Sequence, residues 1–179
     1  RTPVYPVVLA GLYQLLGRSA LSVLILQATL SALVPIVLFV TLRRFFPERV
    51  AILSAVVCVF YPYNLYHDIR VIDTPLFELI LAGLILCLVK LAEHVSARRL
   101  VSAGVLLGLA MQTRPLFLAF PAFLLLWMVF SLYPNVRKAL AVAGVVFGVG
   151  ALTLIPWITR NYAIPHTLVM STNGGWTFY

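Results

Sequence analysis

Long apolar stretches with almost no charged residues are the feature that most limits what this chain can fold into. The stretch Ser19–Leu42 contains no Asp, Glu, Lys or Arg, and it ends at Arg43 and Arg44. A helix needs about 20 apolar residues to cross a hydrocarbon core of about 30 Å. A stretch of this length and composition therefore predicts a membrane-spanning helix.

The same pattern covers the whole chain and excludes several classes of protein. Of 179 residues, 63% are apolar or aromatic and 10% are charged, whereas soluble domains have about 25% charged residues. The formal net charge of +8 comes from sparse cations between apolar runs, not from a dense basic surface. These figures exclude a soluble enzyme, a disordered chain and a nucleic-acid-binding domain. They predict an all-α, polytopic transmembrane helix bundle.

Six apolar segments are predicted to cross the membrane. The segments are Ser19–Leu42, Arg49–Asn64, Thr74–Val95, Leu100–Met111, Leu116–Tyr133 and Ala139–Trp157. Val7–Leu16 is too short to cross and is interpreted as an interfacial helix. The chain then divides into an outer-side juxtamembrane segment (1–18), a six-span bundle (19–157) and the start of an outer-side segment (158–179).

The distribution of cations favours six spans and sets their orientation. One side carries Arg43, Arg44, Arg49, Lys90, Arg98, Arg99, Arg137 and Lys138, and the other carries Arg1, Arg18, Arg70, Arg114 and Arg160. If residues 100–133 crossed only once, Arg137 and Lys138 would exchange sides with Arg160 and the bias would almost vanish. The positive-inside rule places the richer side in the cytoplasm, so both chain ends are predicted outside.

Ionisable residues gather in the predicted outer loop before the third span. Asp68, Arg70 and Asp73 lie in this loop, and Glu78 follows inside the span. Ionisable groups at the centre of a membrane helix cost about 2.5–3.5 kcal/mol each, so they usually face a water-filled cavity or a partner. A functional cavity open to the outer face is therefore expected. Two structural alternatives stay open: Asp73 could simply cap the span, and Glu78 could pair with an arginine.

Metal binding is a further interpretation of the same region. His67 and Asp68, joined by His166 from the last outer segment, carry the ligand types that a divalent metal ion accepts. Their spacing is not diagnostic of any metal site. The alternative is that His67 and Asp68 lie in a solvated loop.

Three solitary arginines, Arg70, Arg114 and Arg160, lie at predicted outer helix ends. The planar guanidinium group suits two-point contact with phosphate. A membrane-embedded substrate with a phosphate headgroup would need such cations at this depth. Snorkelling to the interface, or pairing with Asp73 or Glu78, is the alternative for each arginine.

Several short motifs in order resemble a known family. They are RTPVYP at residues 1–6, LAGLY at 9–13 before Gly17, Thr113-Arg114-Pro115, PWITRNY at 156–162 and VMSTNGG at 169–175. This series resembles the family-39-type bacterial membrane glycosyltransferases, relatives of protein O-mannosyltransferases and of lipid A aminoarabinose transferases. The resemblance implies a GT-C fold. It also implies sugar transfer from a polyprenyl-phosphate carrier to a lipid, glycan or protein acceptor at the periplasmic side of a bacterial inner membrane.

The resemblance also implies roles for individual residues. The family's catalytic aspartate lies in the first outer loop, before the position that matches Arg1, so we expect this chain to be a fragment that lacks the first span and that loop. Arg160 and Arg114 would hold the lipid phosphate, and Asp73 resembles an acidic position near the donor or a divalent metal ion. The predicted substrate-binding set is Tyr66, Arg70, Asp73, Glu78, Arg114, Trp157, Arg160 and Asn173.

Two other classes of function compete with this interpretation. A transporter or flippase of a lipid-linked substrate could use the same outer arginines as a transit site. A membrane scaffold without catalysis is the third hypothesis. A general-base aspartate in the loop before Arg1 would favour the enzyme, because only group transfer needs one.

Overall fold

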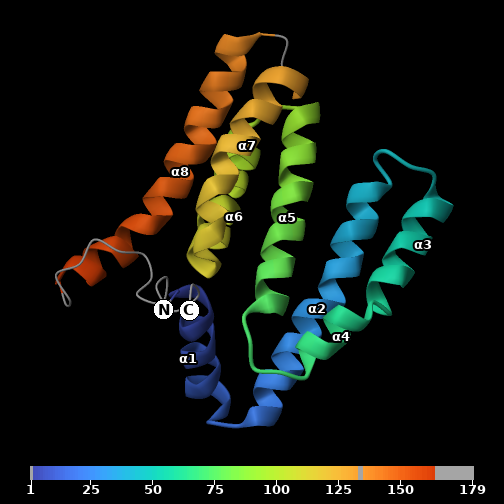
Figure 1. The fold of residues 1–179 in the computed structure, drawn as a ribbon, viewed down its shortest axis with the longest axis vertical. Helices are drawn as coiled ribbons and strands as arrows, with labels where there is room; N and C mark the ends of the chain where they lie inside the picture. Colours follow the sequence, from blue (N-terminus) through green and yellow to red (C-terminus); the bar gives the residue numbers. More distant parts are fainter. Residues whose placement is uncertain (1, 133–134, 164–179) are drawn as a thin grey trace, which may run out of the picture. The chain divides into compact units, whose positions relative to one another are not determined.

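The structure is a computed structural model in which residues 2–132 and 135–163 are described, and these residues form helices with no strand (Figure 1). The prediction of an all-α membrane helix bundle is confirmed. The chain divides into two compact units. We call Tyr5–Lys90 the N-terminal unit, and Arg1–Val4 with Leu91–Tyr179 the C-terminal unit.

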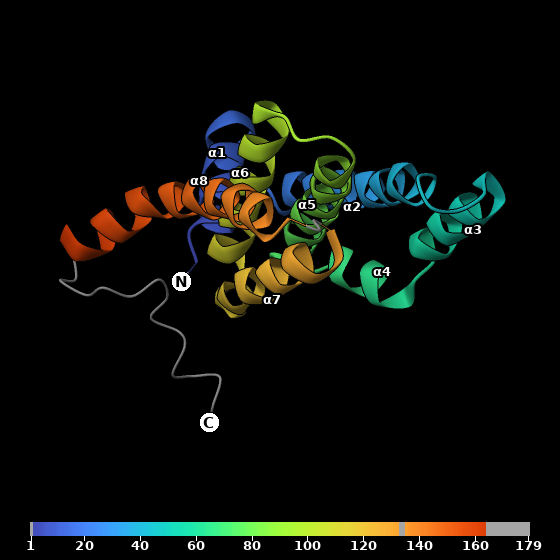
Figure 2. The same ribbon diagram turned by 90° about the horizontal axis from the view of Figure 1, so that it is seen from above.

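The N-terminal unit contains helices that are joined by short connections. They are α1 (Val4–Leu16), α2 (Ala20–Leu42), α3 (Glu48–Val59), α4 (Pro62–Asp68) and α5 (Thr74–Glu93). Helix α3 lies beside α2, which α4 also contacts (Figures 1 and 2). The predicted span Arg49–Asn64 lies within residues 48–67, which are long enough to cross a membrane, but the helix breaks before Pro62. A proline pushes the residue before it out of the helical region. Tyr61 adopts an extended conformation just before Pro62.

Helix α1 begins three residues earlier than the predicted Val7–Leu16. Pro6 lies in its first turn, where the missing backbone N–H would have no helical partner. Gly17 ends the helix with a φ of 74°, and its N–H donates to the Tyr13 carbonyl at 3.1 Å. A glycine adopts this left-handed conformation without steric cost, so the chain can turn at once into α2.

The C-terminal unit consists of α6 (Ala97–Thr113), a 3₁₀ turn (Pro115–Ala119), α7 (Phe120–Trp127), a π-helical turn (Met128–Leu132) and α8 (Val136–Ala163). Helix α6 extends beyond the predicted Leu100–Met111, because the Ser96 hydroxyl caps it by accepting from the Arg99 N–H at 3.4 Å. The described part of the predicted Leu116–Tyr133 is not one regular helix. Pro121 restarts the α-helix after the 3₁₀ turn.

Helices α6 and α8 pack closely and run parallel, with α7 between them in the chain (Figure 1). A Cβ added at Gly104 would lie 2.6 Å from the Val149 Cβ, and one added at Gly108 would overlap the Thr153 hydroxyl. Gly108 lies one turn after Gly104 on α6, and Thr153 lies one turn after Val149 on α8. The two helices therefore run in the same direction. Gly144 and Gly148 have the same spacing in the sequence as Gly104 and Gly108. A Cβ at Gly144 would meet nothing within 4 Å, so that position makes no close helix contact.

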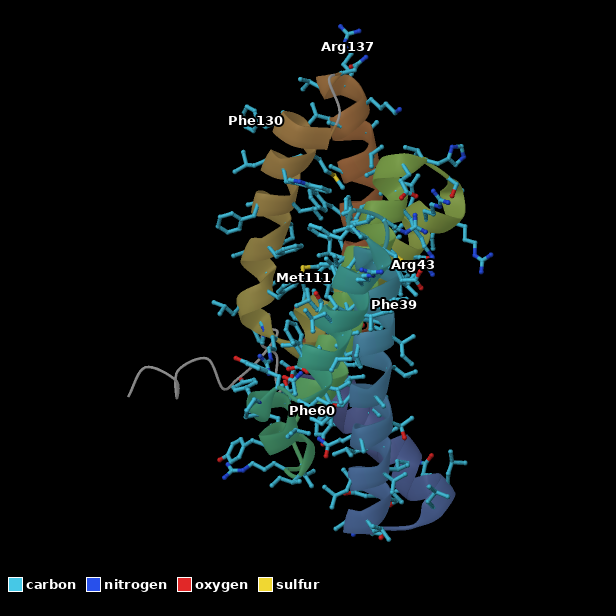
Figure 3. All side chains as sticks on the ribbon, turned by 90° about the vertical axis from the view of Figure 1, so that its right-hand side faces the viewer. Phe39, Arg43, Phe60, Met111, Phe130 and Arg137 are labelled. Atoms are coloured by element: carbon cyan, nitrogen blue, oxygen red, sulfur yellow. The ribbon has the colours of Figure 1, made fainter. Side chains whose placement is uncertain are left out.

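Four helical segments of the described chain are long and apolar enough to cross a membrane: Ala20–Leu42, Glu48–His67, Thr74–Glu93 and Val136–Tyr162. Helix α6 has 17 residues, which reach about 25 Å, and Pro115–Phe130 is also shorter than a full span. The six-span division, which needs both to cross, stays a prediction. Phe130 is 81% exposed and points away from its helix (Figure 3), as expected of a side chain facing lipid.

Candidate functional site

The start of α5 carries Asp73, one of the predicted site residues. The Asp73 carbonyl accepts from the Phe77 N–H at 3.0 Å, so half-buried Asp73 occupies the N-cap position of α5. The neighbouring loop is held by Gln27 of α2, whose Nε2 donates to the Ile72 carbonyl at 2.6 Å. The sequence predicted the capping position of Asp73 as an alternative, but it did not predict the tether from Gln27.

Two buried polar atoms near this helix start have no hydrogen-bond partner among the described residues. They are the Oε1 atom of Gln27, a residue only 1% exposed, and the hydroxyl of Tyr5 on α1. Burial, followed by the charges of Tyr13 and Asp73, raises the pKa of the Tyr5 phenol to about 12. The effect of Asp73 on Tyr5 places the start of α1 near the start of α5.

Cation–aromatic and ring contacts organise the residues of α4. The Arg70 guanidinium carbon lies 4.3 Å from the centroid of the Tyr66 ring. The Nδ1 atom of His67 lies 2.8 Å from the Tyr63 carbonyl, and the two rings are 4.0 Å apart between centroids. A carbonyl can only accept, so this contact requires the proton on Nδ1.

The predicted metal site gains no support from the described residues, where no three His, Cys, Asp or Glu side chains come together to hold a metal ion. Three predicted positions cannot be located. His166 and Asn173 lie outside the described residues, and so does the side chain of Asp68. Metal binding stays a prediction.

Glu78 lines a cavity in the N-terminal unit. The cavity has a volume of about 230 Å³ and is bordered by α2, α4 and α5. Its lining is mainly apolar, and Thr41, Asn64 and Glu78 are its polar members. The sequence predicted a cavity at Glu78, but a water-filled cavity open to the outer face stays a prediction. Asn64 was not singled out from the sequence.

In the C-terminal unit, α8 continues through Pro156 to Ala163, so Trp157 and Arg160 lie on a helix. The Arg160 guanidinium carbon is 4.7 Å from the centroid of the Trp157 ring, three residues earlier and therefore on the same helix face. The Arg160 Nη1 also donates to Asn161 Oδ1 at 3.4 Å. Arg160 is an exposed residue.

Arg114 belongs to the same end of the helix pair. It directly follows Thr113, the last residue of α6, and its side chain is half-buried. Because α6 and α8 run parallel in register, the end of α6 lies at the level where α8 passes beyond Thr153 toward Arg160. The C-terminal unit thus carries two predicted phosphate-binding arginines at one end of one helix pair.

Gln112 is the buried polar residue of this unit that the sequence reasoning missed. It is 8% exposed, and its Nε2 donates to the Thr153 carbonyl at 3.0 Å and to the Thr153 hydroxyl at 3.3 Å. The signal for it was weak: one amide at the end of an apolar helix, two positions before Arg114. Sequence alone gave no partner for that amide.

The structure therefore distributes the predicted site between the units. Tyr66, Arg70, Asp73 and Glu78 belong to the N-terminal unit, whereas Arg114, Trp157 and Arg160 belong to the C-terminal unit.

Comparison with known proteins identifies a family. The model of a family described as dolichyl-phosphate-mannose-protein mannosyltransferase matches residues 1–159, so it includes Asp73, Arg114 and Trp157 and ends one residue before Arg160. No curated protein and no solved structure matches the chain.

Proposed function

The chain belongs to the dolichyl-phosphate-mannose-protein mannosyltransferase family, and from this premise we propose that it transfers a sugar from a polyprenyl-phosphate donor to an acceptor at the outer face of the membrane. The family and the apolar helices make it an integral membrane glycosyltransferase. The observation that carries the finer proposal is the placement of Arg114 and Arg160 at one end of a tightly packed helix pair.

The proposed reaction needs cations where the phosphate leaves. An acceptor oxygen attacks the anomeric carbon, the bond from that carbon to the phosphate oxygen breaks, and polyprenyl phosphate leaves with the bonding electron pair. Guanidinium groups placed beforehand at this phosphate stabilise the charge that develops on it. Arg160 and Arg114, both in the C-terminal unit, supply these groups.

The remaining partners follow from the family pattern. The general base that accepts the acceptor's proton is the aspartate expected before Arg1. The acceptor is a lipid, a glycan or a protein in or at the membrane. The cation distribution predicts that the arginine pair lies on the outer side of the membrane, and the family resemblance implies that this is the periplasmic side of a bacterial inner membrane.

The test uses full-length protein in liposomes with a radiolabelled polyprenyl-phosphate sugar and an acceptor extract. Arg160→Ala should lower the release of polyprenyl phosphate by about 100-fold, the usual cost of removing one stabilising donor. Arg137→Ala is the matched control, because exposed Arg137 lies at the opposite end of α8 (Figure 3) and should leave the rate unchanged.

Two outcomes would overturn the proposal. Movement of label between leaflets without bond cleavage would make the protein a flippase. An equal loss of polyprenyl phosphate release in Arg137→Ala and Arg160→Ala would show that Arg160 has no special role in the reaction.

A further inference from the structure

Gln112 makes the polar contact between α6 and α8. Its Nε2 is within hydrogen-bond distance of the Thr153 carbonyl (3.0 Å), the Thr153 hydroxyl (3.3 Å) and, in its own helix, the Gly108 carbonyl (3.4 Å). The Thr153 hydroxyl donates in turn to the Gly150 carbonyl at 2.7 Å. The amide of α6 is thus connected to two backbone carbonyls of α8, directly to that of Thr153 and through the Thr153 hydroxyl to that of Gly150.

The contact falls at a weak point of α8. Pro156 has no N–H, so the Leu152 carbonyl lacks the donor that a regular helix would provide. A helix tends to bend at such a position, because its backbone ladder is broken there. The Gln112 amide binds the next carbonyl, that of Thr153, and so holds the backbone just before the proline.

Glycines make this contact possible. A Cβ on Gly108 would lie 2.7 Å from the Gly150 carbonyl oxygen and would overlap the Thr153 hydroxyl. The two backbones therefore approach closely only because these positions have no side chain. At this separation a glutamine side chain can reach the backbone of the neighbouring helix.

The helical period connects this contact to the arginines. Trp157 and Arg160 lie four and seven residues after Thr153, so all three share one face of α8. Arg114 lies two residues after Gln112, where α6 ends. A change of bend or rotation of α8 at Pro156 would move Arg160 relative to Arg114.

We propose that Gln112 is a positioning residue, whose amide fixes α8 before Pro156 and thereby sets where Arg160 lies for the lipid phosphate. The inference rests on the proposed function, because it assigns Arg160 to that phosphate. Gln112 acts through the Thr153 backbone and does not itself contact substrate.

The test measures equilibrium binding of radiolabelled polyprenyl phosphate to the full-length protein in nanodiscs, together with the KM values of donor and acceptor. Gln112→Met keeps the volume of the side chain and removes its donor. We expect a roughly tenfold weaker Kd for polyprenyl phosphate and a similar rise in donor KM, with an unchanged acceptor KM. Thr153→Ser retains the hydroxyl and the carbonyl and should bind like the wild type.

A double-mutant cycle separates positioning from general stability. Because Gln112 acts through Arg160, adding Gln112→Met to Arg160→Ala should weaken binding no further. Leu124→Ala is the control: Leu124 is 3% exposed on α7 in the same unit, and its truncation should lower thermal stability without changing the Kd.

The outcomes distinguish this inference from the proposed function. Additive losses in the cycle, or an equal change in Kd in Leu124→Ala, would overturn the positioning role. A wild-type protein that binds polyprenyl phosphate but never releases it from the labelled donor would overturn the proposed transfer, while the cycle would still test Gln112.

Discussion

The two units each bury one glutamine, and the two glutamines are used differently. Gln27 in the N-terminal unit holds a loop by one hydrogen bond to Ile72, and its Oε1 has no partner among the described residues. Gln112 in the C-terminal unit connects two helices and donates to several oxygens. One glutamine tethers a connection, whereas the other fixes the geometry of a helix pair.

The difference extends to the charged residues. Asp73 and Glu78, the acidic members of the predicted site, lie in the N-terminal unit, whereas Arg114 and Arg160 lie in the C-terminal unit. The arginines are placed by close backbone packing, and Asp73 is placed by the start of one helix and a tethered loop. The comparison teaches that the position of the two arginines depends on close helix packing within the C-terminal unit. The position of Asp73 depends instead on a tethered connection within the N-terminal unit, near the Gln27 and Tyr5 oxygens that have no hydrogen-bond partner among the described residues.

The largest expected effect comes from breaking the helix pair. Gly108→Ala places a Cβ 2.7 Å from the Gly150 carbonyl oxygen, so the helices must separate. We expect a loss of about 3 kcal/mol in unfolding free energy, at the upper end for an overpacked interface. Thermal and denaturant unfolding in detergent micelles measure it. Gly144→Ala is the control on α8, because its Cβ would meet nothing within 4 Å. Equal losses in both variants would contradict the comparison.

The sequence could not have made this distinction. Gly104 and Gly108 have the same spacing as Gly144 and Gly148, and only the structure shows that the first pair faces another backbone. Hydrophobicity predicted where the helices lie, since apolar length is a property of each segment alone. Pairing depends on which faces meet, and apolar runs of nearly uniform composition carry little information about faces.

The candidate site was predictable to a similar degree. Arg114, Arg160 and Asp73 stood out because charge is rare in this chain, and they lie at the ends of α6, α8 and α5. Gln27 and Gln112 were missed because a single amide in an apolar run shows only that a partner exists. The identity of that partner is a long-range property of the fold.

The next effect concerns the turn between α1 and α2 in the N-terminal unit. Gly17 has a φ of 74°, so Gly17→Ala forces a side chain into the left-handed region and should cost about 1–2 kcal/mol. Gly11→Ala is the matched control within α1, where a Cβ meets nothing within 4 Å. That change should stabilise the helix by about 0.5–1 kcal/mol. Opposite signs in the unfolding midpoints are expected, and a loss in both variants would contradict the role of the turn.

A comparison of the two glutamines gives a smaller effect. Gln27→Met removes one hydrogen bond to Ile72 but also removes an unpaired buried oxygen, so the two contributions partly cancel. We expect a net loss of about 1 kcal/mol or less. Gln112→Met should lower the unfolding free energy more than Gln27→Met does, because it removes hydrogen bonds to Thr153 without removing an unpaired atom. Equal losses of unfolding free energy in Gln27→Met and Gln112→Met would contradict the difference proposed between the two glutamines.

The smallest effect concerns Tyr5, the other buried hydrogen-bonding group without a partner in the described chain. Tyr5→Phe removes an unpaired hydroxyl and should change stability at neutral pH by about 0.5 kcal/mol or less.

The pH dependence of the unfolding free energy is the sharper measurement for Tyr5. The pKa of Tyr5 is raised from 10.0 to about 12 in the folded chain, so the unfolded chain releases its proton first. The stabilisation is complete below pH 10, and it is lost as the pH rises through about 12. In detergent micelles the wild type should therefore lose stability over this interval relative to Tyr5→Phe. Parallel curves would show that the Tyr5 phenol is not buried beside Asp73, and that the start of α1 is not held near the start of α5.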